Sequence, residues 1–280
     1  MTVRVQLGTR EVALGLVDPR SLCYWLIAMT IKTPYAPSDG VKIPNLDPFF
    51  GPDAPSLPDP EPMPDAMQQN PHILYVMQIL ADLLTDRLDT FADTNTIVYY
   101  DPGDRNRRLQ PDVYVAFDVD ARAIRRRNGY LIWEVGKPPD FVLEVASETT
   151  ASNDTGDKRE LYARMGVAEY WRFDASGGEM YGGALVGEYL EQGEYREFPV
   201  HTTVDGVIWS YSPLLRLNMR WNDGEIELQD PDTGEILLDR RGVRLAMETA
   251  MEAERQARLE AERELEEYRE LVRQLRQERE

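Results

Sequence analysis

The sequence predicts an α/β fold, of the α+β kind with a mixed sheet, and three observations carry that prediction. Short β-like runs recur between residues 96 and 173 and are interrupted by one helical stretch. Turn dipeptides such as Gln192-Gly193 and Asp223-Gly224 then recur to about Asp239, which is typical of a β-meander. After Gly242 the chain holds no glycine or proline, and its Glu, Arg, Ala and Leu content predicts a long helix.

Composition divides the chain into three segments. Residues 1–65 hold two short apolar runs, Val3–Leu7 and Ser21–Ile31, and a proline-rich arm. Eleven of the 19 prolines lie between Pro34 and Pro71, which excludes a helix or central strand and predicts an extended arm, partly in polyproline II conformation. The other two segments are a globular domain, residues 66–240, and a C-terminal helix, residues 241–280.

Bulk properties limit the class of protein. The chain has 280 residues and one cysteine, Cys23, which excludes an internal disulfide and disfavours a cysteine-based metal site. The longest apolar run is about half the length that a membrane-spanning helix needs, and the first residues lack the pattern of a signal peptide. We therefore expect a soluble cytoplasmic protein with no membrane partner.

The net charge of −19 restricts how the chain can meet a nucleic acid. A protein that binds phosphates usually presents a basic face, so any contact here must come from a local basic patch. Two arginine clusters are candidates, Arg105, Arg107 and Arg108, and Arg122, Arg125, Arg126 and Arg127. The alternative is that both clusters are solvated loops.

Local signals place the elements of the globular domain. A first helix is predicted to begin at Asn70-Pro71, with asparagine as N-cap and proline at the first helical position, and to end at Asp89-Thr90. A second helix is predicted to begin with Asp154 as N-cap and to end at the C-cap glycine Gly166. Strands are predicted over Thr96–Tyr100, Val113–Phe117, Tyr130–Val135, Phe141–Ser147 and Glu169–Phe173.

Apolar residues in the tail repeat with the spacing of a coiled coil. Their list, at steps of three and four with one additional four-residue step, is Ala246, Ala250, Ala253, Ala257, Ala261, Leu265, Tyr268, Val272 and Leu275. This seam predicts self-association into a homo-oligomer such as a dimer through about five heptads. The alternative is a single solvated helix held by Glu–Arg pairs.

One carboxylate stands in the middle of an apolar run suited to a buried strand. Glu144 lies within Phe141–Ser147 and is expected on the same face as Val142 and Ala146. An unpaired buried charge costs several kcal/mol or more, on the order of tens in the idealised limit. A buried Glu144 therefore requires a metal ion or a cationic partner.

A second acid, Asp112, stands at the start of a neighbouring predicted strand, directly after Pro111. Two carboxylates from neighbouring strands provide hard oxygen ligands of the kind that Mg²⁺ takes, with waters completing its shell. Lys158 lies one turn into the second helix, with Tyr162 four residues on at the same face. Since lysine near a helix N-terminus opposes the macrodipole, Lys158 is predicted to orient water or neutralise a phosphate; the alternative is a solvated lysine.

Together these residues resemble the Uma2 family of putative restriction endonucleases, which is similar to the PD-(D/E)XK nuclease superfamily. The resemblance covers roughly residues 66–240. It rests on the combined spacing of several short motifs, listed here in chain order: Pro111-Asp112, Glu144-Val145-Ala146-Ser147, Thr149/Thr150, Asp154, Lys158, Tyr162, Gly166-Val167, Glu169-Tyr170-Trp171 and Asp174.

The resemblance implies a restriction-endonuclease-like core, with a core helix, a bent sheet and a metal site. Asp112, Glu144 and the backbone carbonyl of Ala146 would bind Mg²⁺ or Mn²⁺. The superfamily's usual lysine position is Ala146 here, and Lys158 matches the family's lysine on the following helix. An early acidic signature is replaced by Asp39-Gly40-Val41-Lys42; His72 or Gln69 substitutes for it, or His72 has a buried or capping role.

The leading hypothesis is a metal-dependent endonuclease that hydrolyses DNA through Asp112, Glu144 and Lys158. The alternative is a catalytically inactive binding or scaffold protein of nuclease fold that oligomerises through its C-terminal helix. A glycosidase with Asp112 and Glu144 as its acid/base pair is weaker, since it gives Lys158 no role.

Overall fold

The computed structural model describes residues 3–7, 10–14, 43, 45–51, 56–57, 66–94 and 96–277. The chain divides into two compact units, Met1–Leu237 and Leu238–Glu280, which are described separately. The predicted apolar run Ser21–Ile31, much of the proline-rich arm and the segment Asp39–Lys42 lie outside the described residues.

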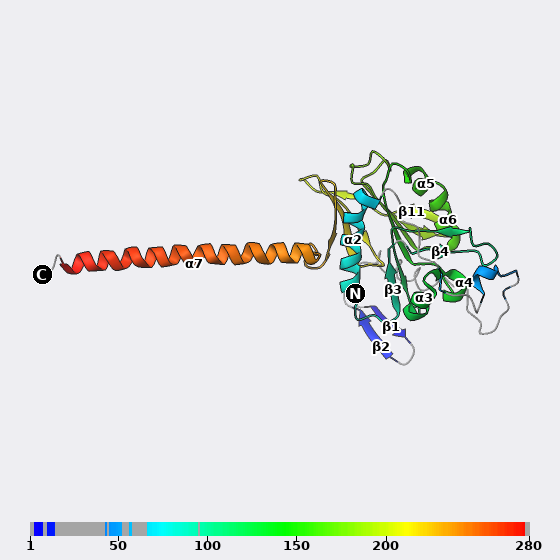
Figure 1. Cartoon of the computed structure of the whole chain (residues 1–280), viewed down its shortest axis with the longest axis horizontal. Coiled ribbons are helices and arrows are strands. Elements are labelled where there is room, and N and C mark those ends of the chain that lie inside the picture. Colours follow the sequence, from blue (N-terminus) through cyan, green and yellow to red (C-terminus); the bar gives the residue numbers. More distant parts are fainter. Residues whose placement is uncertain are drawn as a thin grey trace. The chain divides into compact units, whose positions relative to one another are not determined.

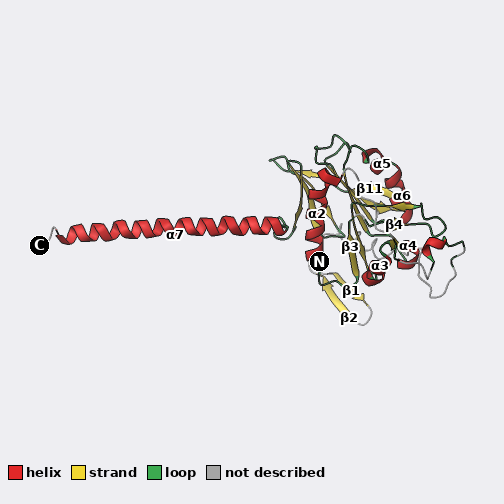
Figure 2. Ribbon diagram, viewed as in Figure 1, coloured by secondary structure: helices red, strands yellow, loops and turns green. Residues whose placement is uncertain are grey.

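A six-stranded mixed sheet forms the centre of the first unit (Figures 1 and 2). Its spatial order is β11 (Glu194–Glu197), β10 (Leu185–Glu191), β9 (Glu169–Phe173), β8 (Phe141–Val145), β6 (Val113–Phe117) and β3 (Thr90–Asp93). β8 and β9 are parallel, and every other neighbouring pair in this sheet is antiparallel. The predicted strands at residues 113–117 and 169–173 are confirmed, and the predicted mixed α/β class is correct.

Helix α2 (Ala66–Leu83) covers one face of this sheet. Its buried residues Val76 and Leu80 belong to one apolar core with Leu143 and Trp171. The predicted start at Asn70-Pro71 is wrong, because the helix already includes both residues, and Pro71 stands inside it. Proline lacks an N–H, so one bond to the preceding turn is missing, and apolar packing of the later turns sustains the helix. The helix also ends before Asp89, so that Thr90 begins β3.

Two short helices lie on the opposite face (Figure 1), and the second of them packs against a second apolar core. α5 (Ala151–Thr155) and α6 (Asp157–Met165) meet at Gly156, where the predicted single helix is broken. α6 ends as predicted at Gly166, whose φ of 91° is a left-handed C-cap conformation that glycine adopts readily.

Smaller elements flank the large sheet. A three-stranded sheet contains β5 (Arg108–Leu109), β4 (Val98–Tyr99) and β7 (Tyr130–Leu131). The predicted strand Tyr130–Val135 is wrong in its second half, which forms the helical turn α4 (Ile132–Val135) before Gly136 at φ 91°. The remaining short elements are α3 (Ala121–Arg127), the 3-10 turn η1 (Pro48–Phe50), β1 (Val3–Leu7) and β2 (Arg10–Leu14).

The predicted β-meander is present as a four-stranded antiparallel sheet. Its strands are β12 (His201–Thr202), β13 (Ile208–Ser212), β14 (Leu217–Asn222) and β15 (Glu225–Gln229). Asp223 and Gly224 have φ values of 49° and 88°, which suit the two-residue hairpin between β14 and β15. The inner side of this sheet contributes Met219 and Leu228 to the core around α2.

The second unit contains the single long helix α7 (Arg240–Gln277). Between Val243 and Tyr268 its large apolar side chains are exposed, including Leu259 at 44% and Leu265 at 49%. Exposed ion pairs such as Arg258–Glu262, at 3.0 Å, add only a few tenths of a kcal/mol each. The part of the apolar seam from Ala246 to Tyr268 is therefore available to a partner helix.

We predict that α7 sets the oligomeric state. Truncation after Arg241 should leave the first unit folded and lower the mass per particle, because a buried seam is the main stabilising contact of a coiled coil. In the full chain, Leu265→Glu should have the same effect, whereas Leu259→Glu, equally exposed but outside the predicted seam, should not. Sedimentation velocity at matched concentrations measures the number of chains per particle, and an unchanged number after truncation would contradict the prediction.

Candidate active site

The sheet register brings the two predicted acids together. Val113 of β6 pairs with Leu143 of β8, and one step further in this antiparallel register Asp112 faces Glu144. Both are buried, with Asp112 at 4% and Glu144 at 1% exposure. The backbone N–H of Val145 donates to Asp112 Oδ2 at 2.7 Å, which fixes the first carboxylate at the end of the second acid's strand.

Helix α6 supplies the cation and a hydroxyl to the second acid. Lys158 Nζ lies 3.2 Å from Glu144 Oε2, and the Tyr162 hydroxyl donates to Glu144 Oε1 at 2.7 Å. The i, i+4 spacing places both side chains on the buried face of α6, as the sequence predicts. Lys158 is therefore the cationic partner that a buried Glu144 requires.

Burial dominates the electrostatics of this group. It raises the pKa of Glu144 to about 8, with the charges of Asp112 and Asp154 adding to the effect and Lys158 opposing it. It also raises the pKa of Asp112 to about 6, against the hydrogen bond from Val145 and the charge of Lys158. Burial alone would lower the pKa of Lys158, but the charges of Glu144 and Asp154 outweigh it and raise that pKa.

A third acid, Asp154, also contacts Lys158. Its Oδ1 lies 2.7 Å from Lys158 Nζ, and its Oδ2 accepts a hydrogen bond from the Tyr181 hydroxyl at 2.7 Å. The predicted N-cap role of Asp154 is wrong, because the residue lies inside α5 and its carboxylate points to these two groups. The spacing of four between Asp154 and Lys158 was the available signal; no sequence signal indicated Tyr181.

The core helix reaches the same end of the sheet through Gln69. Its Nε2 donates to the backbone carbonyl of Val145 at 2.5 Å. His72, one turn further, is buried against the ring of Phe173, with centroids 5.0 Å apart, and lies 3.6 Å from Glu225. The buried role predicted for His72 is confirmed, and Gln69 is the residue of α2 beside the acids.

These residues fit a hard divalent cation in their donor chemistry. Asp112 and Glu144 offer carboxylate oxygens, the ligands that Mg²⁺ and Mn²⁺ prefer. Across the residues that the structure describes, no group of three or more His, Cys, Asp or Glu side chains is arranged to hold a metal. A bound cation would therefore depend on two acids and on backbone or solvent oxygens. It would also share Glu144 with Lys158.

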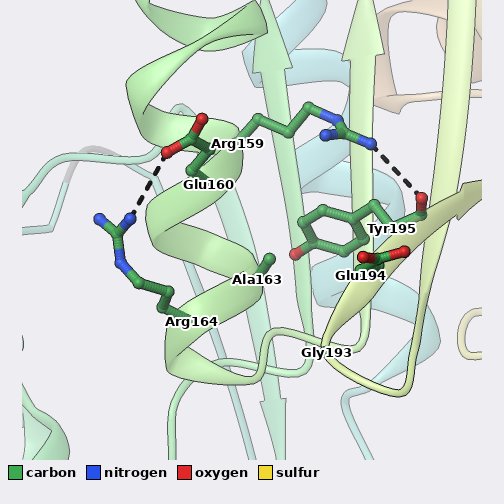
Figure 3. Close-up of a pocket in the computed structure, with 7 residues that line it drawn as sticks. All are labelled: Arg159, Glu160, Ala163, Arg164, Gly193, Glu194 and Tyr195. Atoms are coloured by element: carbon green, nitrogen blue, oxygen red, sulfur yellow. Dashed lines mark hydrogen bonds and ion pairs between the residues drawn. The ribbon is translucent and has the colours of Figure 1, made fainter.

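A separate ion cluster lies on the same face, one strand further. Arg172, the register partner of Glu144 on β9, pairs with Glu188 at 3.1 Å, and Glu188 also pairs with Arg159 at 2.6 Å. Arg159 also lines an open pocket of about 430 Å³ beside the β10–β11 hairpin, where it donates to the Tyr195 carbonyl (Figure 3). The pocket is lined by the more exposed positions of α6, whereas Lys158 and Tyr162 face Glu144.

Comparison with known proteins assigns the family. The model of the family Uma2, described as "Putative restriction endonuclease", matches residues 60–220, more than half of the chain. The chain belongs to the Uma2 family. The resemblance predicted from the sequence is thereby confirmed.

One solved structure similar to this Uma2 protein is a putative nuclease belonging to DUF820 from Anabaena variabilis ATCC 29413. The two share 15% identity, the match covers 52% of this chain and 76% of that chain, and the TM-score is 0.33. No curated protein matches the chain. In the part of the chain that the structure describes, no helix has the length and apolar character to cross a membrane.

The segment Glu169-Tyr170-Trp171 contains a buried acid outside the Asp112–Glu144–Lys158 group. Glu169 accepts hydrogen bonds from Trp171 Nε1 at 2.9 Å, Ser212 Oγ at 2.6 Å and Leu214 N at 2.8 Å. Burial nevertheless raises the pKa of Glu169 to about 7, because these donors only partly replace water. Glu169 therefore connects β9 to the meander and makes that connection sensitive to pH.

We predict that Glu169 makes the free energy of unfolding fall as the pH rises. Since its pKa is raised above 4.5, its contribution is complete below about pH 4.5 and is lost as the pH rises through about 7. Glu169→Gln should be less stable at acidic pH but should lose less stability between about pH 5 and about pH 7.5, by up to about 3 kcal/mol. Urea unfolding at both pH values measures this, with exposed Glu197→Gln as control; parallel losses in wild type and Glu169→Gln would contradict it.

Proposed function

We propose that this Uma2 protein is a metal-dependent endonuclease that hydrolyses phosphodiester bonds of DNA. One observation carries the proposal: Asp112 and Glu144 face each other at a sheet end, with the ammonium of Lys158 3.2 Å from Glu144. Two carboxylates beside a lysine can hold a divalent cation and stabilise a negatively charged phosphate. Family membership supports the same class of reaction.

The residues have distinct roles in this proposal. Asp112 and Glu144 would hold Mg²⁺ or Mn²⁺ with a backbone carbonyl, Ala146 being the one that the family resemblance implies. When bound, the ion supplies an activated water and offsets charge on the phosphate. Lys158 positions the attacking water and stabilises developing negative charge, and the Tyr162 hydroxyl orients the Glu144 carboxylate.

DNA would be held against an unfavourable global charge by local arginines. Arg122, Arg125 and Arg126 are exposed on α3, which the structure makes a helix rather than a loop. Arg127 has a structural role instead of a DNA contact in this proposal, since it pairs with Glu134 at 3.0 Å and donates to the Phe50 carbonyl. We place the reaction in the cytoplasm, as expected for a chain with a single cysteine, and propose a dimer through α7.

A second candidate function, a non-catalytic scaffold of nuclease fold, is favoured by the burial of the site. The side chains of Glu144 and Lys158 are 1% and 11% exposed and satisfy each other, so the pair also suits a purely structural role. A glycosidase is disfavoured, because it gives no role to Lys158, whose ammonium lies 3.2 Å from Glu144.

We predict that Glu144→Gln abolishes metal-dependent DNA cleavage while the protein without metal remains as stable as wild type or gains up to about 2 kcal/mol. The loss of repulsion from Asp112 and of a desolvated charge offsets the lost ion pair with Lys158. Mg²⁺ or Mn²⁺ should raise the melting temperature of wild type and not that of Glu144→Gln, because a ligand of the native state stabilises by mass action. Thermal melts and plasmid nicking measure the two effects.

Glu188→Gln is the matched control, since it breaks a similarly buried ion pair two strands away from Glu144. It should keep both cleavage and the metal-induced shift. If wild type ignores the metal and Glu144→Gln is destabilised by several kcal/mol, Glu144 is a structural residue and the scaffold function replaces the nuclease.

We predict that DNA binding depends on α3. Arg122→Ala/Arg126→Ala should reduce the slope of log affinity against log salt by about two units, because each lost phosphate contact removes about 0.9. Arg164→Ala/Arg196→Ala, an equal charge change at side chains 66% and 57% exposed, is the control. If the two double variants have the same slope of log affinity against log salt, the α3 arginines are solvated and do not contact phosphates.

A further inference from the structure

Lysine is rare in this chain, and of the two lysines that the structure describes, Lys158 is the one placed between two buried acids. The sequence has 31 Lys and Arg residues, of which only Lys32, Lys42, Lys137 and Lys158 are lysines. Lys158 Nζ lies closer to Asp154, at 2.7 Å, than to Glu144, at 3.2 Å. A compact ammonium with three donors can bridge two carboxylates, whereas a guanidinium is suited to a planar bidentate pair.

Asp154 is held by groups that do not involve Glu144. It is fully buried, its Oδ2 accepts from the Tyr181 hydroxyl at 2.7 Å, and its backbone carbonyl accepts from the Tyr170 hydroxyl at 2.8 Å. Tyr181 lies in the loop between β9 and β10, and Asp174 orders that loop by accepting from the N–H groups of Met180 and Tyr181 at 2.8 and 3.1 Å. The position of Asp154 is therefore set independently of the acid pair.

The Glu144 carboxylate, in contrast, would interact with both Lys158 and the proposed cation. It lies opposite Asp112 in the register, and in the proposed function it also binds a cation. A cation on Glu144 would weaken the attraction between Glu144 and Lys158, because its charge opposes that of the ammonium. Without another anchor, Lys158 would then leave its place or compete with the cation.

We propose that Asp154 is the positioning residue that keeps Lys158 in place when the charge of Glu144 is neutralised, with Tyr181 orienting the Asp154 carboxylate. Its part in catalysis rests on the proposed nuclease function; the holding of Lys158 does not. Asp154 contacts neither substrate nor water in this proposal and acts through Lys158.

The test follows the ammonium of Lys158 by nuclear magnetic resonance in protein labelled with ¹⁵N-lysine. An ammonium held in a buried ion pair exchanges its protons slowly and gives a resolved signal, whereas a released one does not. Glu144→Gln neutralises the glutamate without any metal. Lys158 should keep its signal in Glu144→Gln and lose it in Glu144→Gln/Asp154→Asn, while Glu144→Gln/Glu188→Gln should keep it.

Lys137, which pairs with Asp140 at 2.7 Å, provides a signal in the same spectrum that reports an intact fold. If Glu144→Gln/Asp154→Asn loses that signal too, Glu144→Gln/Tyr181→Phe takes its place, since it removes only the hydroxyl that orients Asp154. Faster exchange of the Lys158 ammonium in this variant than in Glu144→Gln supports the proposal, and unchanged exchange overturns it.

Addition of Mg²⁺ to wild type separates this inference from the proposed function. A shifted but retained Lys158 signal supports both. No response to Mg²⁺ overturns the nuclease function and leaves the metal-free arm to decide the role of Asp154. Loss of the Lys158 signal in Glu144→Gln alone, or its retention in folded Glu144→Gln/Asp154→Asn, overturns the role of Asp154.

Discussion

The ion pair between Lys158 and the buried acids is the interaction on which the rest of the site depends. Glu144 and Asp154 lie where water cannot solvate them, and a single ammonium lies within 3.2 Å of both. Removing the ammonium from this group would leave the buried carboxylates uncompensated, which costs about 3–5 kcal/mol. The elements around the site, β6, β8, α5, α6 and the Tyr181 loop, can be understood as the means of keeping these charges together.

Two features of the backbone place the charges. The antiparallel register of β6 and β8 sets Asp112 opposite Glu144, and a slip of one residue would turn either side chain to the face covered by α2. The break at Gly156 separates α5 from α6, with Asp154 in the first helix and Lys158 in the second. The positions of the charged side chains in the site therefore depend on the β6–β8 register and on the helix break at Gly156.

Much of this arrangement could be predicted from the sequence. Glu144 in an apolar strand required a metal ion or a cation, and the helical period places Lys158 and Tyr162 on one face. The sequence predicted a role for Lys158 toward water or a phosphate, and only the packing of α6 shows that it pairs with Glu144. The roles of Tyr181 and Gln69 could not be predicted, because each depends on long-range packing that leaves no local pattern. Asp154 was misassigned, since an aspartate near a helix start usually caps it.

The boundaries of the helices and strands likewise separate what local sequence predicts from what long-range packing decides. Pro71 favoured a helix start by local propensity, yet α2 continues through it, because burial of residues such as Val76 and Leu80 outweighs one missing hydrogen bond. Strands buried on both faces, β6 and β9, were predicted residue for residue. Prediction succeeded for strands that are buried on both faces, because such strands have a continuous apolar sequence. It failed where tertiary contacts outweigh a local helix-start or capping preference.

We propose above all that Asp112 and Glu144 form a cation site and that Lys158 shares the place beside Glu144 with the cation. Anomalous diffraction from a crystal of wild type soaked in Mn²⁺ tests this proposal directly. We expect a manganese peak within about 2.0–2.3 Å of oxygens of both acids, with the Lys158 ammonium still paired to Asp154. A structure with no peak between the acids, and with Lys158 still on Glu144, would contradict it.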